Sequence, residues 1–185
     1  MDETTILQMV LRWIHLVAGV AWIGILYFFN LVNVNFMKSI DAPTKGKVIP
    51  GMLAPALWYF RWGAVVTVLS GLAYFVWIVS AEGSHKALGI WLVIVLALYA
   101  LMFALIEVMK VNNGNALAAI FTVMTAVLAL TVWKFAGFAS SRSISIGIGG
   151  GMGMWMFLNV WGIIWRAQKK IIAWTAENVA KGTPM

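Results

Sequence analysis

The chain alternates between long apolar stretches and short polar breaks. Five stretches each reach or exceed the roughly 20 residues that a helix needs to cross a bilayer. They predict spanning helices at approximately 6–37, 56–80, 87–110, 116–138 and 147–174. Because these stretches take up almost the whole chain, we expect a single all-α membrane domain over residues 1–185, a bundle of about five transmembrane helices.

The polar breaks are rich in residues that end helices and favour turns. The longest break, residues 38–55, holds three of the four prolines, and the shorter ones are AEGSHK, NNGN and ASSRS. We therefore predict a long connection after the first span. Its residues Lys38, Lys45 and Lys47 are suited to contact with anionic headgroups of membrane lipids.

The composition supports a membrane protein and excludes several kinds of site. Hydrophobic residues make up 63% of the chain and charged residues 10%. A chain with no cysteine cannot hold a disulfide, an Fe–S cluster or a covalently attached haem c. The formal net charge is +7, but the basic residues lie at segment ends, which favours membrane topology over nucleic acid as the explanation.

The basic residues also predict an orientation. With five spans, one side of the membrane collects nine of them and the other side four. The larger group comprises Lys38, Lys45, Lys47, Arg61, Lys110, Arg166, Lys169, Lys170 and Lys181, and the smaller comprises Arg12, Lys86, Lys134 and Arg142. Because cytoplasmic segments are richer in Lys and Arg, we expect a bacterial inner-membrane protein with its N-terminus outside and its C-terminus in the cytoplasm.

The first span carries polar groups that are costly in hydrocarbon. Residues three or four apart form one stripe along it: Arg12, His15, Gly19, Trp22, Leu26, Phe29, Asn30 and Asn33. His15 is the only histidine in an apolar stretch, and a neutral imidazole there can ligate haem iron or another metal. Gly19 would leave room for a flat ring, and Trp22 would stack on it. The alternative is that His15 hydrogen-bonds a neighbouring helix and Gly19 serves helix packing.

Two further charged positions stand out. Arg61 lies about one turn inside the second span among aromatic residues, where it can hold a haem propionate or a lipid phosphate. The alternative for Arg61 is snorkelling within an interfacial aromatic belt. Glu107 precedes Lys110 by three residues, which predicts an ordinary helical ion pair.

Glycines gather at the predicted start of the last span. In lipid, glycines allow another helix or a ring to approach the backbone closely, and Gly149 and Gly153 form a GxxxG pair. We expect this pair to mediate self-association or packing with other membrane subunits. A slot for a cofactor is the alternative.

Three segments resemble one known family. They are RWIHLVAGVAWIG at 12–24, FRWGAVVTVLSG at 60–71 and GGGMGMWMFLNVWGIIWRAQKKI at 149–171. They are similar to the membrane domain at the N-terminus of cytochrome-c-linked urate oxidases (urate dehydrogenases). The first segment also resembles, more distantly, the first helix of HemJ-type protoporphyrinogen oxidases and copper-resistance D proteins. The resemblance implies a helical domain that holds haem b through membrane histidines, with His15 as an axial ligand, and passes electrons to a cytochrome c.

The chain departs from that family in two respects. Alignment through Asn159 places Gly147 where the family has a second histidine, and a chain without cysteine has no CxxCH motif of a cytochrome c domain. We therefore predict a short stand-alone form that is not a complete enzyme alone. It would be a subunit of a larger or homo-oligomeric complex, with a haem b or quinone-type pocket around His15, Trp22 and Arg61. A cofactor-free structural or assembly subunit and a small-molecule transporter are the alternatives.

Overall fold

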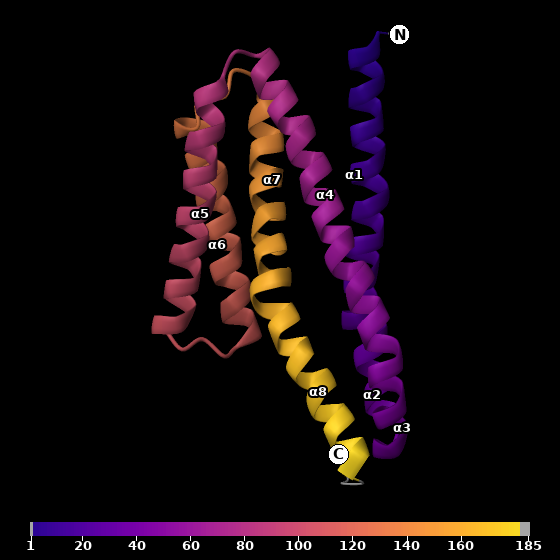
Figure 1. Ribbon diagram of the computed structural model, residues 1–185. Coiled ribbons are helices and arrows are strands. Elements are labelled where there is room, and N and C mark those ends of the chain that lie inside the picture. The colour runs from indigo at the N-terminus through magenta and orange to yellow at the C-terminus, as the bar shows by residue number, and fades with distance from the viewer. Residues whose placement is uncertain (1, 182–185) are drawn as a thin grey trace. The chain divides into compact units, whose positions relative to one another are not determined.

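The computed structural model describes residues 2–181, which form five helical rods and no strand (Figure 1). The first rod joins α1 (Glu3–Tyr27), η1 (Phe28–Asn33) and α2 (Val34–Ser39), and the second joins α3 (Ala42–Val48), η2 (Ile49–Leu53) and α4 (Ala54–Ala81). Next come α5 (His85–Val108) and α6 (Gly114–Phe135), and the last rod joins α7 (Ser141–Asn159), η3 (Val160–Ile164) and α8 (Trp165–Lys181). The segments η1, η2 and η3 are π-helical turns, which are one residue wider than α-helical turns.

All five rods are long and apolar enough to cross a membrane. Large apolar side chains lie on their outer faces, for example Val93 at 67% exposed and Val20 at 66%. Such a surface is unfavourable in water and natural in hydrocarbon. The prediction of an all-α membrane bundle with about five spanning helices is confirmed.

The described chain divides into two compact units. The terminal unit comprises residues up to 70 together with those from 157 on, and the central unit comprises residues 71–156. Helix α4 and the last rod therefore contribute one part to each unit. The predicted single domain stays a prediction, because the division does not test whether the units act together.

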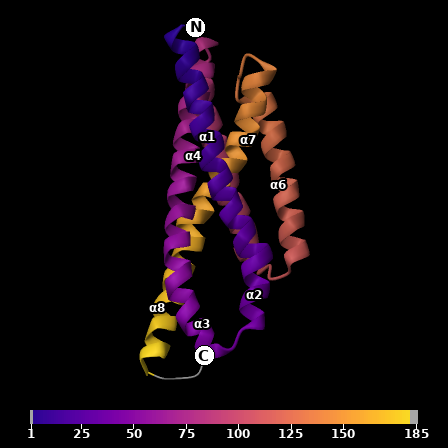
Figure 2. The same cartoon turned by 90° about the vertical axis from the view of Figure 1, so that its right-hand side faces the viewer.

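In the terminal unit, α1 contacts the first half of α4, and α3 and η2 lie against α8. Gly63 lets α4 approach Trp22 of α1, since a Cβ at Gly63 would lie 3.5 Å from the Trp22 Cβ. Trp22 is only 3% exposed. Figure 2 shows α3 beside α8 at the lower end of this unit, in agreement with their residue contacts.

In the central unit, α5 and α6 form a hairpin that packs with α7 and the second part of α4 around buried side chains such as Phe75 and Leu128 (Figure 1). Two indole groups connect α5 and α7, because one indole of each helix donates a hydrogen bond to a backbone carbonyl of the other. Trp91 of α5 donates to the Gly147 carbonyl at 2.7 Å, and Trp155 of α7 donates to the Val95 carbonyl at 2.8 Å. Both indole N–H groups are thereby satisfied in a buried position.

The prediction of a long connection over residues 38–55 is wrong. Only Ile40 and Asp41 interrupt the helices there. Asp41 has extended backbone and caps α3, and Pro43 lies in the first turn, where a helix needs no N–H donor. Pro50 lies in η2, and the wider π turn is one way for a helix to pass a proline. Prolines that usually signal a loop are here accommodated within one rod.

Two smaller predictions are also wrong. The last rod begins at Ser141, earlier than expected, because the Ser140 hydroxyl accepts from the Ser143 N–H at 3.1 Å and starts the helix. The Glu107–Lys110 ion pair does not form. Helix α5 ends at Val108 and Lys110 has a left-handed backbone with φ of 48°, so the pair is no longer on one helical face. A salt bridge does join Lys181 to Glu177.

Candidate functional site

His15 of α1 is tied to the backbone of α4. Its Nδ1 lies 2.8 Å from the carbonyl oxygen of Thr67. Because a carbonyl can only accept, Nδ1 is the donor, and Nε2 is the ring nitrogen left for a ligand. The residue as a whole is exposed. This is the tautomer and orientation in which histidine binds a metal through Nε2.

Gly19 and Trp22, which were expected to make room for a ring and to stack on it, both lie at the contact between α1 and α4. A Cβ at Gly19 would lie 3.6 Å from the Thr67 Cγ2, so Gly19 lies at the contact between α1 and α4. Trp22 is buried toward Gly63, and its indole Nε1 has no hydrogen-bond partner. Within the terminal unit these residues therefore do not enclose a ring-shaped space beside His15.

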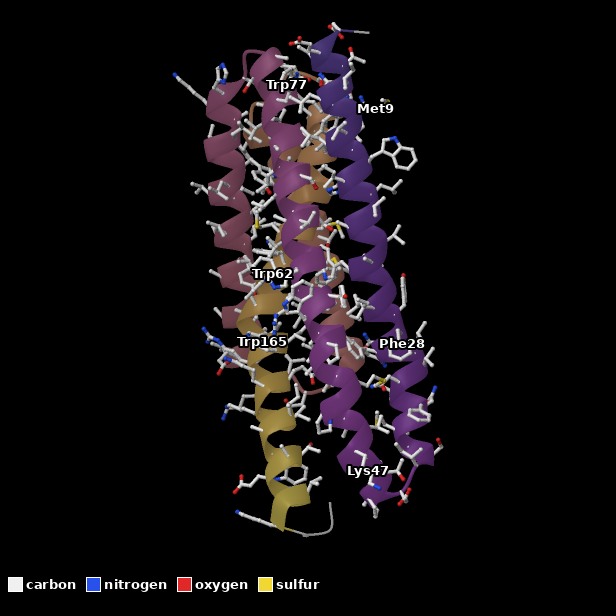
Figure 3. All side chains as sticks on the ribbon, turned by 45° about the vertical axis from the view of Figure 1, so that its right-hand side comes forward. Met9, Phe28, Lys47, Trp62, Trp77 and Trp165 are labelled. Atoms are coloured by element: carbon white, nitrogen blue, oxygen red, sulfur yellow. The ribbon has the colours of Figure 1, made fainter. Side chains whose placement is uncertain are left out.

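Arg61 belongs to a separate aromatic cluster. Its guanidinium carbon lies 3.3 Å from the ring centre of Trp165 and 5.8 Å from that of Trp161. Its Nε and Nη1 are buried without a hydrogen-bond partner, so the indole faces provide their compensation through cation–π contact. Trp62 packs edge-on against Trp161 at 6.4 Å. Figure 3 labels two residues of this cluster, Trp62 and Trp165.

The four residues predicted to bind a cofactor thus occupy three places. His15 and Gly19 share the contact with Thr67, Trp22 fills the space opposite Gly63, and Arg61 stacks on α8. Their role in cofactor binding stays a prediction. The geometry favours His15 as a ligand-competent group and gives the other three a packing role within this unit.

Sequence reasoning missed a cavity of about 380 Å³ in the terminal unit. It lies between the first two rods and the last, and its walls are mostly apolar. Its lining residues are Leu26, Phe29, Asn30, Asn33, Val34, Met37, Ile49, Leu53, Leu57, Phe60, Ile164, Gln168 and Ile171. The later residues of the predicted stripe on the first span line this cavity, namely Leu26, Phe29, Asn30 and Asn33. His15 does not line it.

All three π-helical turns contribute to the wall of this cavity. Asn30 and Asn33 come from η1, Leu53 from η2 and Ile164 from η3. The Asn30 amide donates to the Leu26 carbonyl at 2.8 Å, four residues earlier on the same rod. Single π turns are rare and occur frequently at functional sites. Pro50 was the one sequence signal that could have indicated such a turn.

The glycines of α7 separate into two faces. A Cβ at Gly147 would lie 2.8 Å from Phe138, and one at Gly151 would lie 3.0 Å from Leu128, so both face the packed interior of the central unit. Cβ atoms at Gly149 and Gly153 would meet nothing within 4 Å. The predicted GxxxG pair is therefore on an open face of its helix.

Comparison of the chain with family models, with curated proteins and with solved structures gives no match. The resemblance to the urate oxidase membrane domain therefore stays an expectation from the residues alone.

Proposed function

We propose that this protein is an integral membrane subunit of a larger or homo-oligomeric complex, in which His15 ligates haem b for electron transfer. The observation that carries the proposal is the hydrogen bond from His15 Nδ1 to the Thr67 carbonyl. This bond fixes the ring and leaves Nε2 as the ligand atom, the arrangement common to metal-bound histidines.

The residues of the terminal unit fit one axial ligand and only part of a haem site. Bound haem would supply one-electron chemistry. His15 would hold the iron through Nε2, and its bond to Thr67 would orient the imidazole. Because Gly19 and Trp22 are used in packing against α4, the remaining walls would come from a partner subunit or a second copy. Such a shared site accounts for an exposed ligand without a second histidine in this unit.

The test is an absorption spectrum of the detergent-purified protein, oxidised and dithionite-reduced, with haem quantified as the pyridine hemochrome. His15→Asn is the sharpest variant, because the Asn amide reproduces the Nδ1–H donor to Thr67 but has no atom at Nε2. We expect a Soret band in the wild type and its loss in His15→Asn at unchanged thermal stability. His85→Ala is the matched control, since His85 is exposed at the start of α5.

Other outcomes of this experiment would point elsewhere. A wild-type protein without haem, or a His15→Asn variant that keeps it, would refute the assignment. A colourless protein in which His15→Ala lowers stability and His15→Asn does not would favour the second candidate, a cofactor-free structural or assembly subunit. That candidate is supported by the same Thr67 bond, read as a link between α1 and α4.

We further propose that the open glycine face of α7 mediates association with another copy or another membrane subunit. Its support is the space above Gly149 and Gly153, which allows close approach of a second helix. Gly149→Ile and Gly153→Ile are expected to reduce cross-linked oligomers in native membranes without unfolding the protein. Unchanged cross-linking in both variants would refute this role.

The proposed location is a bacterial inner membrane with the C-terminus in the cytoplasm, supported by the excess of basic residues on that side. A chain without cysteine makes this testable, because every introduced thiol is the only one present. A cysteine at Lys47 is expected to resist a membrane-impermeant thiol reagent in whole cells, whereas one at Lys86 should react. The reverse pattern would invert the topology.

A further inference from the structure

We propose that the cavity of the terminal unit binds a neutral, lipid-soluble molecule that carries a hydroxyl group on a ring, of the phenol or quinol class. The proposal does not rest on haem at His15, because His15 is not among the residues that line the cavity. It places the quinone-type pocket, which the sequence alone suggested around His15, Trp22 and Arg61, further along the first rod, from Leu26 onward.

The neutrality of the proposed ligand is inferred from the absence of charged residues among those that line the cavity. None of the lining residues is charged, and their polar groups are the amides of Asn30, Asn33 and Gln168. An ionised ligand would lie in a low-dielectric space without a counter-charge, at a large desolvation cost. Three amides against ten apolar side chains suit a molecule with an apolar body and few polar atoms.

The hydroxyl group of the proposed ligand is inferred from the hydrogen bonds that the cavity amides make and lack. Asn33 lines the cavity, and its Oδ1 is buried without a hydrogen-bond partner. Asn30 already gives one amide hydrogen to Leu26. Because an unmade hydrogen bond in such a position is costly, a ligand that donates one is favoured. A hydroxyl donates, whereas a quinone carbonyl, an ether or an alkyl chain does not.

The ring follows from the aromatic and size complementarity of the walls. Phe29 and Phe60 both line the cavity and meet edge to face, with ring centres 6.5 Å apart. A third ring beside them would gain the same type of contact. The volume of about 380 Å³ lies within the usual range for small-molecule pockets.

The experiment is a calorimetric titration of the full chain in nanodiscs, with empty nanodiscs subtracted. The probes are 4-hexylphenol and its methyl ether, 4-hexylanisole, which are similar in size and apolarity and differ in the hydroxyl donor. We expect saturable one-to-one binding of the phenol and about tenfold weaker binding of the ether, since one buried hydrogen bond separates them.

Three variants connect this binding to the cavity. Asn33→Leu should weaken phenol binding about tenfold and leave the ether unchanged. Asn35→Leu is the matched control on the same rod, because the Asn35 amide is bonded to the Leu31 carbonyl and Asn35 does not line the cavity. Ile171→Trp should abolish binding of both probes by filling the space, and the 44% exposure of Ile171 makes it tolerant of substitution.

The proposal is overturned if no saturable binding is found, if phenol and ether bind equally, or if Ile171→Trp binds as well as wild type. Equal binding of 4-hexylbenzoate would overturn the requirement for neutrality. The same titration in His15→Asn should be unchanged. A failure of haem binding and a failure of this cavity can therefore be told apart.

Discussion

The clearest quantitative prediction concerns two glycines half a turn apart on α7. Gly151 is buried and Gly149 is exposed. A Cβ at Gly151 would lie 3.0 Å from Leu128 Cδ2 and 3.1 Å from Val95 Cγ2, both tighter than ordinary van der Waals contact. A Cβ at Gly149 would meet open space. The substitutions Gly151→Ala and Gly149→Ala thus add the same atom to the same helix in opposite surroundings.

The magnitude can be worked from these two environments. Replacing a helical Gly by Ala stabilises by about 1 kcal/mol at either position, because Gly loses more backbone entropy on folding. Adding a methyl group to a packed core costs about 1–3 kcal/mol when the neighbours have to shift. The helix term cancels in the comparison, so Gly151→Ala should be about 1–3 kcal/mol less stable than Gly149→Ala.

The assay is reversible unfolding of the detergent-solubilised protein with increasing sodium dodecyl sulfate, followed by circular dichroism. Several protein concentrations should be compared, because an effect of Gly149→Ala on association would depend on concentration and an effect on packing would not. Equal stability of the two variants within about 0.5 kcal/mol, or a less stable Gly149→Ala at every concentration, would refute the assignment of the two faces.

Three further outcomes are expected. Trp155→Phe should cost about 1 kcal/mol more stability than Trp22→Phe in the same unfolding assay, since only the Trp155 indole loses a hydrogen bond; equal costs would contradict this. Arg61→Gln should lower the melting temperature relative to wild type, because a neutral amide removes the cation from the indoles of η3 and α8, and an unchanged value would argue against cation–π compensation. Hydrogen bonds from Thr5 and Thr4 lower the pKa of Asp2 at the start of α1, so the carboxylate cap should be fully present above the ordinary pKa of an aspartate and lost as the pH falls through the lowered pKa. Amide exchange in the first turn of α1, corrected for intrinsic rates, would show this, and pH-independent protection would exclude it.

The number and type of the rods could be predicted because each apolar stretch is long enough to decide its own structure. Residues 42–55 could not, since Pro43, Pro50 and Pro55 normally favour loops. Whether a proline ends a helix or is absorbed by a wider turn depends on how the neighbouring rods satisfy the freed backbone groups. That information lies in α8 and α1, which are distant in sequence.

The candidate site was predictable only in part for a similar reason. The period of an α-helix predicted one stripe for His15, Asn30 and Asn33, but it gave no information on which residues lie opposite each part of that stripe. The two glycine pairs of α7 are an equivalent case. Residues 147 and 151 lie on one face and 149 and 153 on another, and the sequence offers equally small residues on both. Which face is covered is decided by Phe138, Val95 and Leu128, through tertiary packing.

The three π turns also determine the rotational phase of the rods. Each wide turn contains one residue more than an α-helical turn, and one residue corresponds to about 100° of rotation around a helix. If the residues of η1 were wound as an α-helix instead, every later side chain of that rod would turn by this angle, so Val34 and Met37 would leave the cavity wall together. The same holds for η2 and η3 with respect to Leu57 and Gln168. The extra residue that each of these three turns accommodates therefore determines which side chains meet at the cavity.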